Sequence, residues 1–253
     1  MKIEFCESFD EAIGDIFDGA SLMAFCWGVS GTPQNLISAL HDKGTKDLTV
    51  ISHNFLPAFV ANNILWDVVT PFILEEQVKK LITAWPGTSI VGIESPMERR
   101  IKEGNAELEL MSHGILVERI RAGGSGIGGF YSPIGIGTIV EEGKEKKTID
   151  GIEYILEKPL KADFGFVRAY KADRMGNLIY HGGGRACNPI IAMASRVTIA
   201  EVDEIVEVGD IDPEVVVTPG IFVDRVVKIP EGGLGSSKER VRILQELCKG
   251  DAE

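Results

Sequence analysis

Three short stretches of this 253-residue chain carry residue types that could take part in chemistry. The first is the turn at residues 28–32 (GVSGT) and the second is the triplet at 52–54 (SHN), and each follows a run of apolar residues. The third, residues 121–138, contains seven glycines around one aromatic pair. Glycine suits positions where φ is positive or where another group comes very close to the backbone. We therefore expect the third stretch to contact a ligand or a partner chain; a surface loop without function is the alternative.

Hydrogen-bond donors are the chemistry that the first two stretches offer. The side-chain amide of Asn54 could polarise a carbonyl group, and so could the backbone amides of Gly31 and Thr32 if they lie at the start of a helix. An ordinary turn residue is the alternative for Asn54. His53 could act as a general base, but no partner carboxylate can be assigned from the sequence, so a solvent-exposed loop histidine is the preferred interpretation.

Several familiar site types are not expected. Gly124-x-Gly126-x-x-Gly129 matches the glycines of the dinucleotide fingerprint, but a helix-like stretch precedes it and Phe130-Tyr131-Ser132-Pro133 follows, where the fingerprint needs a strand and then a helix. The chain has no G-x-S-x-G, no Walker loop and no H-E-x-x-H. Its four histidines and four cysteines are scattered, with no C-x-x-C pair, so we expect reduced thiols and no metal site.

The elements that would position these residues follow from the hydrophobic pattern. The apolar run at 22–27 predicts a strand, and residues 33–43 predict a helix with Thr32 as its N-cap, Pro33 at its first position and Gly44 after its end. A second buried strand follows at 48–52, so residues 22–52 form a predicted βαβ unit with parallel strands. Ligands of such sheets bind outside the carboxyl ends of the strands, where the first two candidate stretches lie.

Further strand-like runs predict one larger sheet. They lie at 81–85, 165–170, 178–182, 196–202 and 215–220. The turn signal at 173–177 predicts a hairpin, so we expect a mainly parallel, partly mixed sheet covered by helices, and a last helix over 236–247. No composition break divides the chain, which favours one α/β domain over residues 1–253.

Composition limits the partners. Lys and Arg number 26 against 38 Asp and Glu, and the net charge of −12 opposes binding to nucleic acid or to an anionic membrane. A small anionic ligand is compatible with that charge because backbone dipoles can hold it. Neither a transmembrane span nor a signal peptide is recognised in the sequence, so a cytoplasmic location is expected.

Five ordered blocks of the sequence resemble the alpha subunit of the acid CoA-transferases, the group that includes acetate, butyrate and 3-oxoacid CoA-transferases. The blocks are Asp18-Gly19 with the apolar run and the Gly31-Thr32-Pro33 segment, the triplet at 52–54, and the stretches at 118–138, 171–177 and 218–227. The resemblance covers nearly the whole chain. It implies an enzyme that moves CoA between an acyl-CoA and a carboxylic acid, with CoA as a substrate and no other cofactor or metal.

The resemblance also implies a division of labour between two chains. In the family, the thioester is attacked by a glutamate in a Ser-Glu-Asn-Gly motif of the beta subunit, and this sequence has no such motif. The chain is therefore expected to be the non-nucleophilic subunit of an α2β2 assembly, with Asn54 as an oxyanion donor. The residues expected to contact substrate are Gly28, Gly31, Thr32, His53, Gly123, Gly124, Gly126 and Phe130.

Two departures from the family pattern leave the acyl group undetermined. Phe25-Cys26-Trp27 stands where the family has Gly-Gly-Phe, and His53 stands where it has an asparagine. A hydrolase of acyl-CoA or of a ring with the same fold, and a non-catalytic regulatory module that binds a small ligand, are the two alternative functions.

Overall fold

The predicted βαβ unit is present, and it lies at the centre of the sheet. The computed structural model describes residues 3–24, 31–55, 60–61, 64–65, 71–87, 94–231 and 233. Strand β2 (Ser21–Ala24) pairs in parallel with β3 (Leu48–Asn54), and helix α2 (Gln34–Lys43) connects them. Gly44 ends the helix with a φ of 72°, the left-handed geometry that glycine adopts easily. The structure thus confirms this part of the prediction.

Among the described residues the main sheet has nine strands. Eight are parallel, in the order β1-β14-β13-β11-β2-β3-β6-β7, and β12 pairs antiparallel with β11. Their bounds are β1 (Glu4–Cys6), β6 (Val78–Trp85), β7 (Glu107–Leu110), β11 (Ala162–Asp173), β12 (Leu178–Ile179), β13 (Ser195–Val206) and β14 (Arg225–Lys228). The fold class predicted from the sequence, a mainly parallel and partly mixed α/β sheet, is confirmed.

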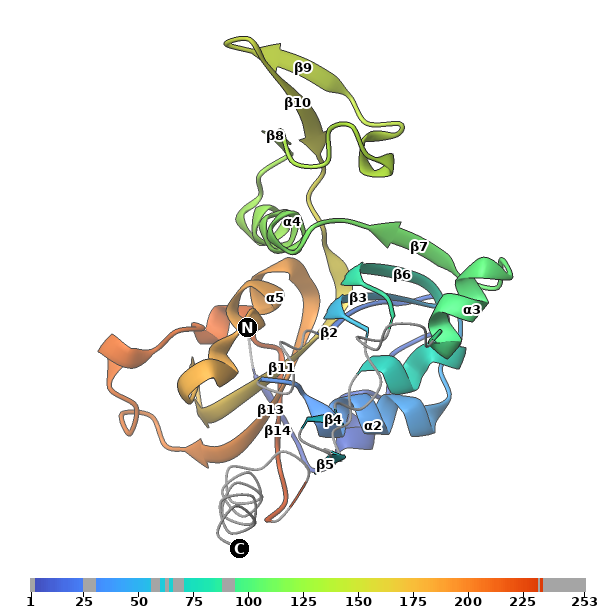
Figure 1. Cartoon of the computed structure of the whole chain (residues 1–253). Helices are drawn as coiled ribbons and strands as arrows, with labels where there is room; N and C mark the ends of the chain where they lie inside the picture. The colour runs from blue at the N-terminus through green and yellow to red at the C-terminus, as the bar shows by residue number, and fades with distance from the viewer. Residues whose placement is uncertain are drawn as a thin grey trace, which may run out of the picture.

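Helices cover both faces of this sheet (Figure 1). They are α1 (Phe9–Ala12), α2, α3 (Pro96–Lys102), α4 (His113–Ser125) and α5 (Asn188–Ala194). Because successive residues of a strand point to opposite faces, Leu22 packs in a cluster with Leu36 of α2, while Met23 packs in a second cluster with Leu116 of α4 and Ile191 of α5. The core therefore consists of two apolar layers separated by the sheet.

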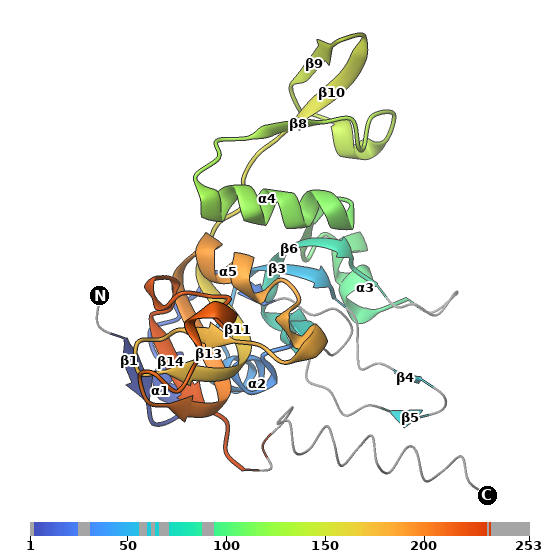
Figure 2. The ribbon, with the colours of Figure 1, turned by 90° about the vertical axis from the view of Figure 1, so that its left-hand side faces the viewer.

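A smaller three-stranded sheet projects beyond α4 (Figure 2). It consists of β8 (Phe130–Ser132), β10 (Ile152–Glu157) and β9 (Lys146–Ile149), all antiparallel, and we call residues 130–157 the arm. The base of the arm is held by Glu157, which is fully buried and forms an ion pair with Lys144 at 2.6 Å. Arg119 of α4 lies 3.9 Å from the same carboxylate and donates a hydrogen bond of 2.6 Å to the carbonyl of Lys158. The arm is thus fixed to α4.

The remaining short elements of the described ranges are a strand pair, β4 (Val60–Ala61) with β5 (Ile64–Leu65), and five 3-10 turns. The turns are η1 (Pro71–Gln77), η2 (Ile139–Glu141), η3 (Gly182–Arg185), η4 (Pro213–Val215) and η5 (Gly220–Phe222). The described part of the chain contains no helix long and apolar enough to cross a membrane.

The hairpin predicted at residues 173–177 is present, whereas the strand predicted at 215–220 is wrong. Strands β11 and β12 pair on either side of the turn, and the amide of Asp173 donates to the carbonyl of Asn177. Residues 215–220 contain the end of η4, the start of η5 and one isolated bridge from Thr218 to Leu178. The next strand, β14, comes later, at Arg225–Lys228, and lies between β1 and β13. The helix predicted at 236–247 lies outside the described residues.

Two glycines of the glycine-rich stretch, Gly123 and Gly124, pack against the chain itself. Both glycines belong to the last turns of α4. A Cβ at Gly123 would overlap the carbonyl oxygen of Leu160, and one at Gly124 would come within 2.6 Å of the Cβ of Met193. Gly126 ends α4 with a φ of 73°. The close approach at these helical glycines comes from the chain itself, and the third glycine serves as a helix C-cap.

Candidate active site

The carboxyl end of β3 brings His53 and Asn54 to the edge of the sheet that α4 covers. Asn54 is the last residue of the strand and pairs in register with Trp85 of β6. Hydroxyl groups hold this strand end: Ser52 Oγ donates to the Asn54 carbonyl at 2.8 Å, and Thr83 Oγ1 donates to the His53 carbonyl at 3.1 Å. The two candidate side chains therefore start from a fixed backbone.

His53 is a buried strand residue, so the preferred interpretation as an exposed loop histidine is wrong. Its side chain is only 2% exposed, and its ring centroid lies 4.0 Å from that of His113 at the start of α4. Burial, and next the charge of His113, lowers the pKa of His53 to about 4, and a hydrogen bond with the Asn54 side chain acts weakly in the opposite direction. His53 is therefore neutral near pH 7 and a poor proton acceptor there.

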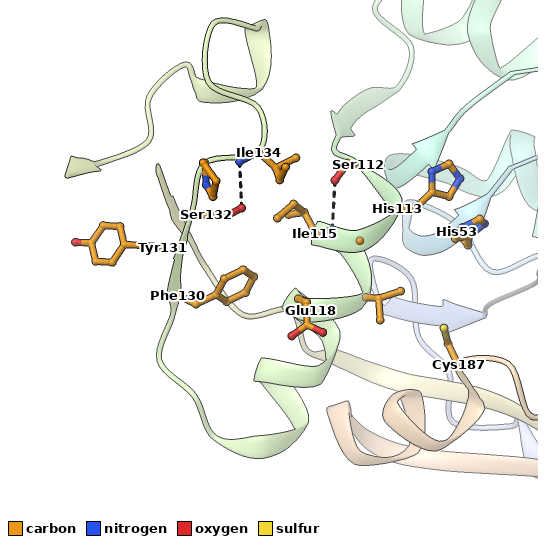
Figure 3. A pocket seen from close by; sticks show the side chains of 13 residues that line it. His53, Ser112, His113, Ile115, Glu118, Phe130, Tyr131, Ser132, Ile134 and Cys187 are labelled. Carbon is orange, nitrogen blue, oxygen red and sulfur yellow. Dashed lines mark hydrogen bonds between the residues drawn. The ribbon is translucent and has the colours of Figure 1, made fainter. Parts of the chain in front are cut away.

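A hollow of about 770 Å³ opens next to this histidine pair, between α4 and the arm (Figure 3). Its walls are His53, Ser112, His113, Gly114, Ile115, Val117, Glu118, Phe130, Tyr131, Ser132, Pro133, Ile134 and Cys187. In Figure 3 the two histidines lie at one end, and Phe130, Tyr131 and Ser132 lie at the other. Its volume falls in the range of small-molecule sites.

The serines and the cysteine of this hollow are hydrogen-bonded or protonated, and its one carboxylate, Glu118, is paired with Arg121 at 2.6 Å. The Ser112 hydroxyl accepts the amide of Ile115 as the N-cap of α4, and the Ser132 hydroxyl accepts the amide of Ile134 at 3.2 Å. Burial raises the pKa of the Cys187 thiol to about 11, so the reactive thiolate is scarce at neutral pH. This part of the site is suited to binding rather than to covalent attack.

The turn that carries Gly31 and Thr32 is held against the start of α5. The side chain of Asn188 donates to the carbonyl of Gly31 and to that of Gly184, both at 3.0 Å, and its oxygen accepts the amide of Arg168 at 3.1 Å. Gly31 has a φ of 74°, and a Cβ there would overlap the carbonyl oxygen of Gly184. Glycine is required at this position for both reasons.

Thr32 does not cap α2, which corrects the prediction. Pro33 takes the N-cap position without a side-chain cap, and Thr32 Oγ1 is buried with no hydrogen-bond partner among the described residues. Glu201 of β13 satisfies the free amides at the start of the helix instead. Its carboxylate accepts hydrogen bonds from the backbone amides of Asn35 and Leu36, at 3.0 Å each. A carboxylate at the positive end of a helix satisfies the unpaired amides and interacts favourably with the dipole.

Glu201 is fully buried, and it was not identified from the sequence. Burial raises its pKa to about 7, even though Arg168 lies 3.6 Å away and favours the charged form. Arg168 in turn forms an ion pair with Asp203 at 2.7 Å. The sequence feature that could have identified it is an acidic residue inside the apolar run at 196–202, because a charge in a buried strand needs a specific partner.

The structure brings together some of the predicted site residues and separates others. His53 and Phe130 line the same hollow, and the Asn54 side chain is hydrogen-bonded to His53. Gly31 and Thr32 lie on the neighbouring turn, and Gly123 and Gly124 lie inside the packing of α4. Gly28, with the departure at residues 25–27, lies outside the described residues. Within the described ranges, no group of three or more His, Cys, Asp or Glu is placed to hold a metal ion.

Comparison with known proteins gives the same family along the whole length of the chain. The family model described as Coenzyme A transferase matches residues 6–229. The A subunit of a probable succinyl-CoA:3-ketoacid coenzyme A transferase of Bacillus subtilis is 43% identical over 97% of this chain and 98% of its own length. The A subunit of a 3-oxoadipate CoA-transferase of Pseudomonas putida is 42% identical over 91% and 95%, and the alpha subunit of an acetate CoA-transferase of Escherichia coli is 39% identical over 87% and 94%.

Solved structures share the fold. The decarboxylase AibA/AibB, solved as a cysteine-to-serine variant, has a TM-score of 0.73 at 26% identity and covers 94% of this chain and 87% of its own. An acyl-CoA transferase of E. coli O157:H7 in a thioester complex with CoA has a TM-score of 0.72 at 23% identity, over 90% of this chain and 48% of its own. The sequence blocks, the sheet order and these matches agree, and the chain belongs to the coenzyme A transferase family.

Proposed function

We propose that this chain is the alpha subunit of a CoA-transferase built from two kinds of subunit, and that it contributes the half of the active site that binds and polarises the substrate. The observation that carries the proposal is the match, over nearly the full length of both chains, to relatives that are named as A subunits. The absence of a Ser-Glu-Asn-Gly motif from the sequence supports it, as does the lack of an available nucleophile among the described residues of the hollow.

The proposed reaction divides between the chains. A beta-subunit carboxylate attacks the carbonyl carbon of an acyl-CoA, the carbonyl electrons move to oxygen, and the CoA thiolate leaves as an acyl anhydride forms. The thiolate then attacks the enzyme carbonyl of the anhydride and releases the acid, and a second acid takes CoA by the reverse sequence. The amide of Asn54 and the backbone amides of Gly31 and Thr32 are the donors that we assign to the negatively charged oxygen.

The state of the histidines is compatible with this sequence of steps. Every attacking group in it is already an anion, a carboxylate or a thiolate, so the chemistry needs no general base. A buried His53 with a pKa of about 4 would be a poor base near pH 7. As a neutral imidazole it would still be able to form hydrogen bonds beside Asn54, without adding a charge there.

The proposal includes an α2β2 assembly in the cytoplasm, with CoA as a substrate and no metal or further cofactor. Four scattered cysteines without a C-x-x-C pair fit a reducing compartment. The relatives' names support a second kind of subunit, and the numbers of each can be measured by native mass spectrometry of the complex formed with a CoA-transferase beta subunit.

The test combines the purified chain with a beta subunit that carries Ser-Glu-Asn-Gly. We expect neither chain alone to exchange CoA between an acyl-CoA and a short-chain acid, and the mixture to do so. Intact-mass analysis after incubation with acyl-CoA should find the covalent CoA adduct on the beta subunit, with none on this chain. Exchange by this chain alone would refute the assignment. Loss of thioester with water as the only acceptor would indicate a hydrolase, and an assembled complex without turnover would indicate a regulatory module.

A further inference from the structure

The hollow between α4 and the arm has one polar end and one apolar end, and this asymmetry bears on the substrate. His53 and His113 form the end nearest Asn54, where the proposed function places the reacting carbonyl. Away from the histidines the wall consists mainly of Ile115, Val117, Phe130 and Ile134. A group bound with its carbonyl at the histidine end would extend along these hydrocarbon side chains.

The described wall of the hollow offers no cation to a second carboxylate. Among the described residues that line the hollow there is no Lys or Arg, and the one carboxylate, Glu118, already forms an ion pair with Arg121 at 2.6 Å. The segments that follow β2, β3 and β6 in the chain contribute none either, because the sequence has no Lys or Arg in residues 3–42, 47–78 or 81–98.

The helix start that borders the hollow does not replace a cation. The Ser112 hydroxyl already accepts an amide of the first turn of α4, and a helix end carries only about half a charge. A carboxylate placed against this apolar wall loses part of its hydration and gains no partner, whereas each methylene placed there gains at most about fourfold in affinity.

On these grounds we propose that the hollow holds the hydrocarbon part of an uncharged acyl group, so that the enzyme selects aliphatic monocarboxylic acids against dicarboxylic acids of the same length. The inference rests on the proposed function, because it takes Asn54 as the reacting end. The proposed monocarboxylic substrates differ from the dicarboxylic compounds that appear in the names of two relatives, succinyl-CoA and 3-oxoadipate.

The test uses the complex of this chain with the beta subunit, together with two matched pairs of acceptor acids, butanoate against butanedioate and hexanoate against hexanedioate. We expect kcat/KM to be at least about tenfold higher for the monocarboxylate of each pair, and higher for hexanoate than for butanoate. A preference for the dicarboxylates would overturn the inference while leaving the proposed function standing.

Two substitutions on the arm test whether the selectivity between mono- and dicarboxylic acids arises from this hollow. Ile134→Lys places a cation at the wall and should narrow or reverse the preference within each pair. Ile139→Lys is the matched control, because Ile139 is 72% exposed on the same arm and is not part of the wall. If Ile134→Lys weakens binding of the beta subunit while the acid preference is unchanged, the hollow packs the partner and the inference is wrong.

A binding measurement separates this inference from the reaction itself. The complex, with this chain labelled at isoleucine methyl groups, is titrated with hexanoate and with hexanedioate. Saturable shifts of the Ile115 and Ile134 signals with hexanoate, and much weaker ones with hexanedioate, support the inference even if no acid accepts CoA. Equal or larger shifts with hexanedioate, or none with hexanoate, would overturn it.

Discussion

Asn54 is the residue whose replacement should affect catalysis most directly. If its amide stabilises the oxyanion, Asn54→Ala should lower kcat by about 10²-fold in the complex with the beta subunit, since a preorganised donor contributes most when charge develops on oxygen. His53→Ala should lower kcat less. Size-exclusion chromatography checks that both variants still assemble. An Asn54→Ala complex with unchanged kcat would return the residue to an ordinary strand-end role.

His53 should also leave a signature in the pH dependence of stability. Its folded pKa of about 4 lies below its ordinary value of 6.5, so the unfolded chain takes up the proton first and stability falls as pH falls from about 6.5 to 4. His53→Asn, which installs the residue of the family triplet, should lose less stability over that range. Denaturant midpoints of the two proteins at pH 7.5, 6, 5 and 4.5 measure the difference, and a constant difference would contradict the prediction.

Because Glu201 also titrates in this range, the difference in stability between wild type and His53→Asn at each pH is more informative than the pH profile of the wild-type protein alone. The folded pKa of Glu201 is about 7 and lies above its ordinary value of 4.5, so its contribution declines as pH rises from about 4.5 to 7. The two residues thus act in opposite directions over nearly the same range. Comparing wild type with a His53 variant cancels the Glu201 contribution, because Glu201 is present in both proteins.

For single residues, the sequence predicted their position in an element better than it predicted their burial and contacts. Asn54 and His53 were correctly placed at a strand end, because an apolar run followed by polar residues is a local signal. The burial of His53 depends on α4, which lies about sixty residues later in the chain, so no local pattern could show it. Thr32 had the right residue type for an N-cap, but Glu201 from a distant strand supplies the contact.

At the scale of elements, the glycines of α4 test how closely this helix packs against α5. Gly124→Ala should destabilise the chain by about 1–3 kcal/mol, because the new Cβ meets Met193 of α5 and one of the helices must shift. Gly114→Ala on the same helix is the matched control: a Cβ there meets nothing within 4 Å, and alanine is the better helix former. Urea denaturation of the three proteins gives both values. Equal stability of Gly124→Ala and wild type would show that the two helices pack more loosely than the structure indicates.

Element prediction succeeded where one local pattern determines the element. The βαβ unit has continuous apolar strands, a helix and a glycine stop, and all were predicted from adjacent residues. Residues 215–217 are three consecutive valines, but Pro213 and Pro219 flank the run, and the position next to β13 is taken by β14. Gly123 and Gly124 were expected to contact a ligand but pack against the chain itself, because packing within the chain and ligand contact select the same residue type.

At the scale of the whole molecule, the arm is the feature that the sequence did not suggest. It stands beyond α4, away from the nine-stranded sheet (Figure 2), and the sequence shows no composition break at either end of it. Ile139, Ile149 and Ile152 are exposed on it, so little of its apolar surface contributes to the core. Its anchor is polar and local: Glu157 with Lys144, and Arg119 with the Lys158 carbonyl.

This arrangement predicts that most of the arm can be removed without unfolding the sheet. Ser132 and Ile155 are direct partners in the antiparallel pair of β8 and β10, so an Asn-Gly turn in place of residues 133–154 would join two strands that already lie side by side. Because the deletion also removes Lys144, the ion-pair partner of the buried Glu157, the shortened chain carries Glu157→Gln as well. We expect it to unfold in one transition, with a thermal midpoint within a few degrees of that of the full-length Glu157→Gln chain. Circular dichroism melts of both chains measure this. An insoluble product, or a midpoint lowered by more than about 10 °C, would show that the arm folds as part of the core, because each kcal/mol lost shifts the midpoint of a chain this size by only about 2–4 °C.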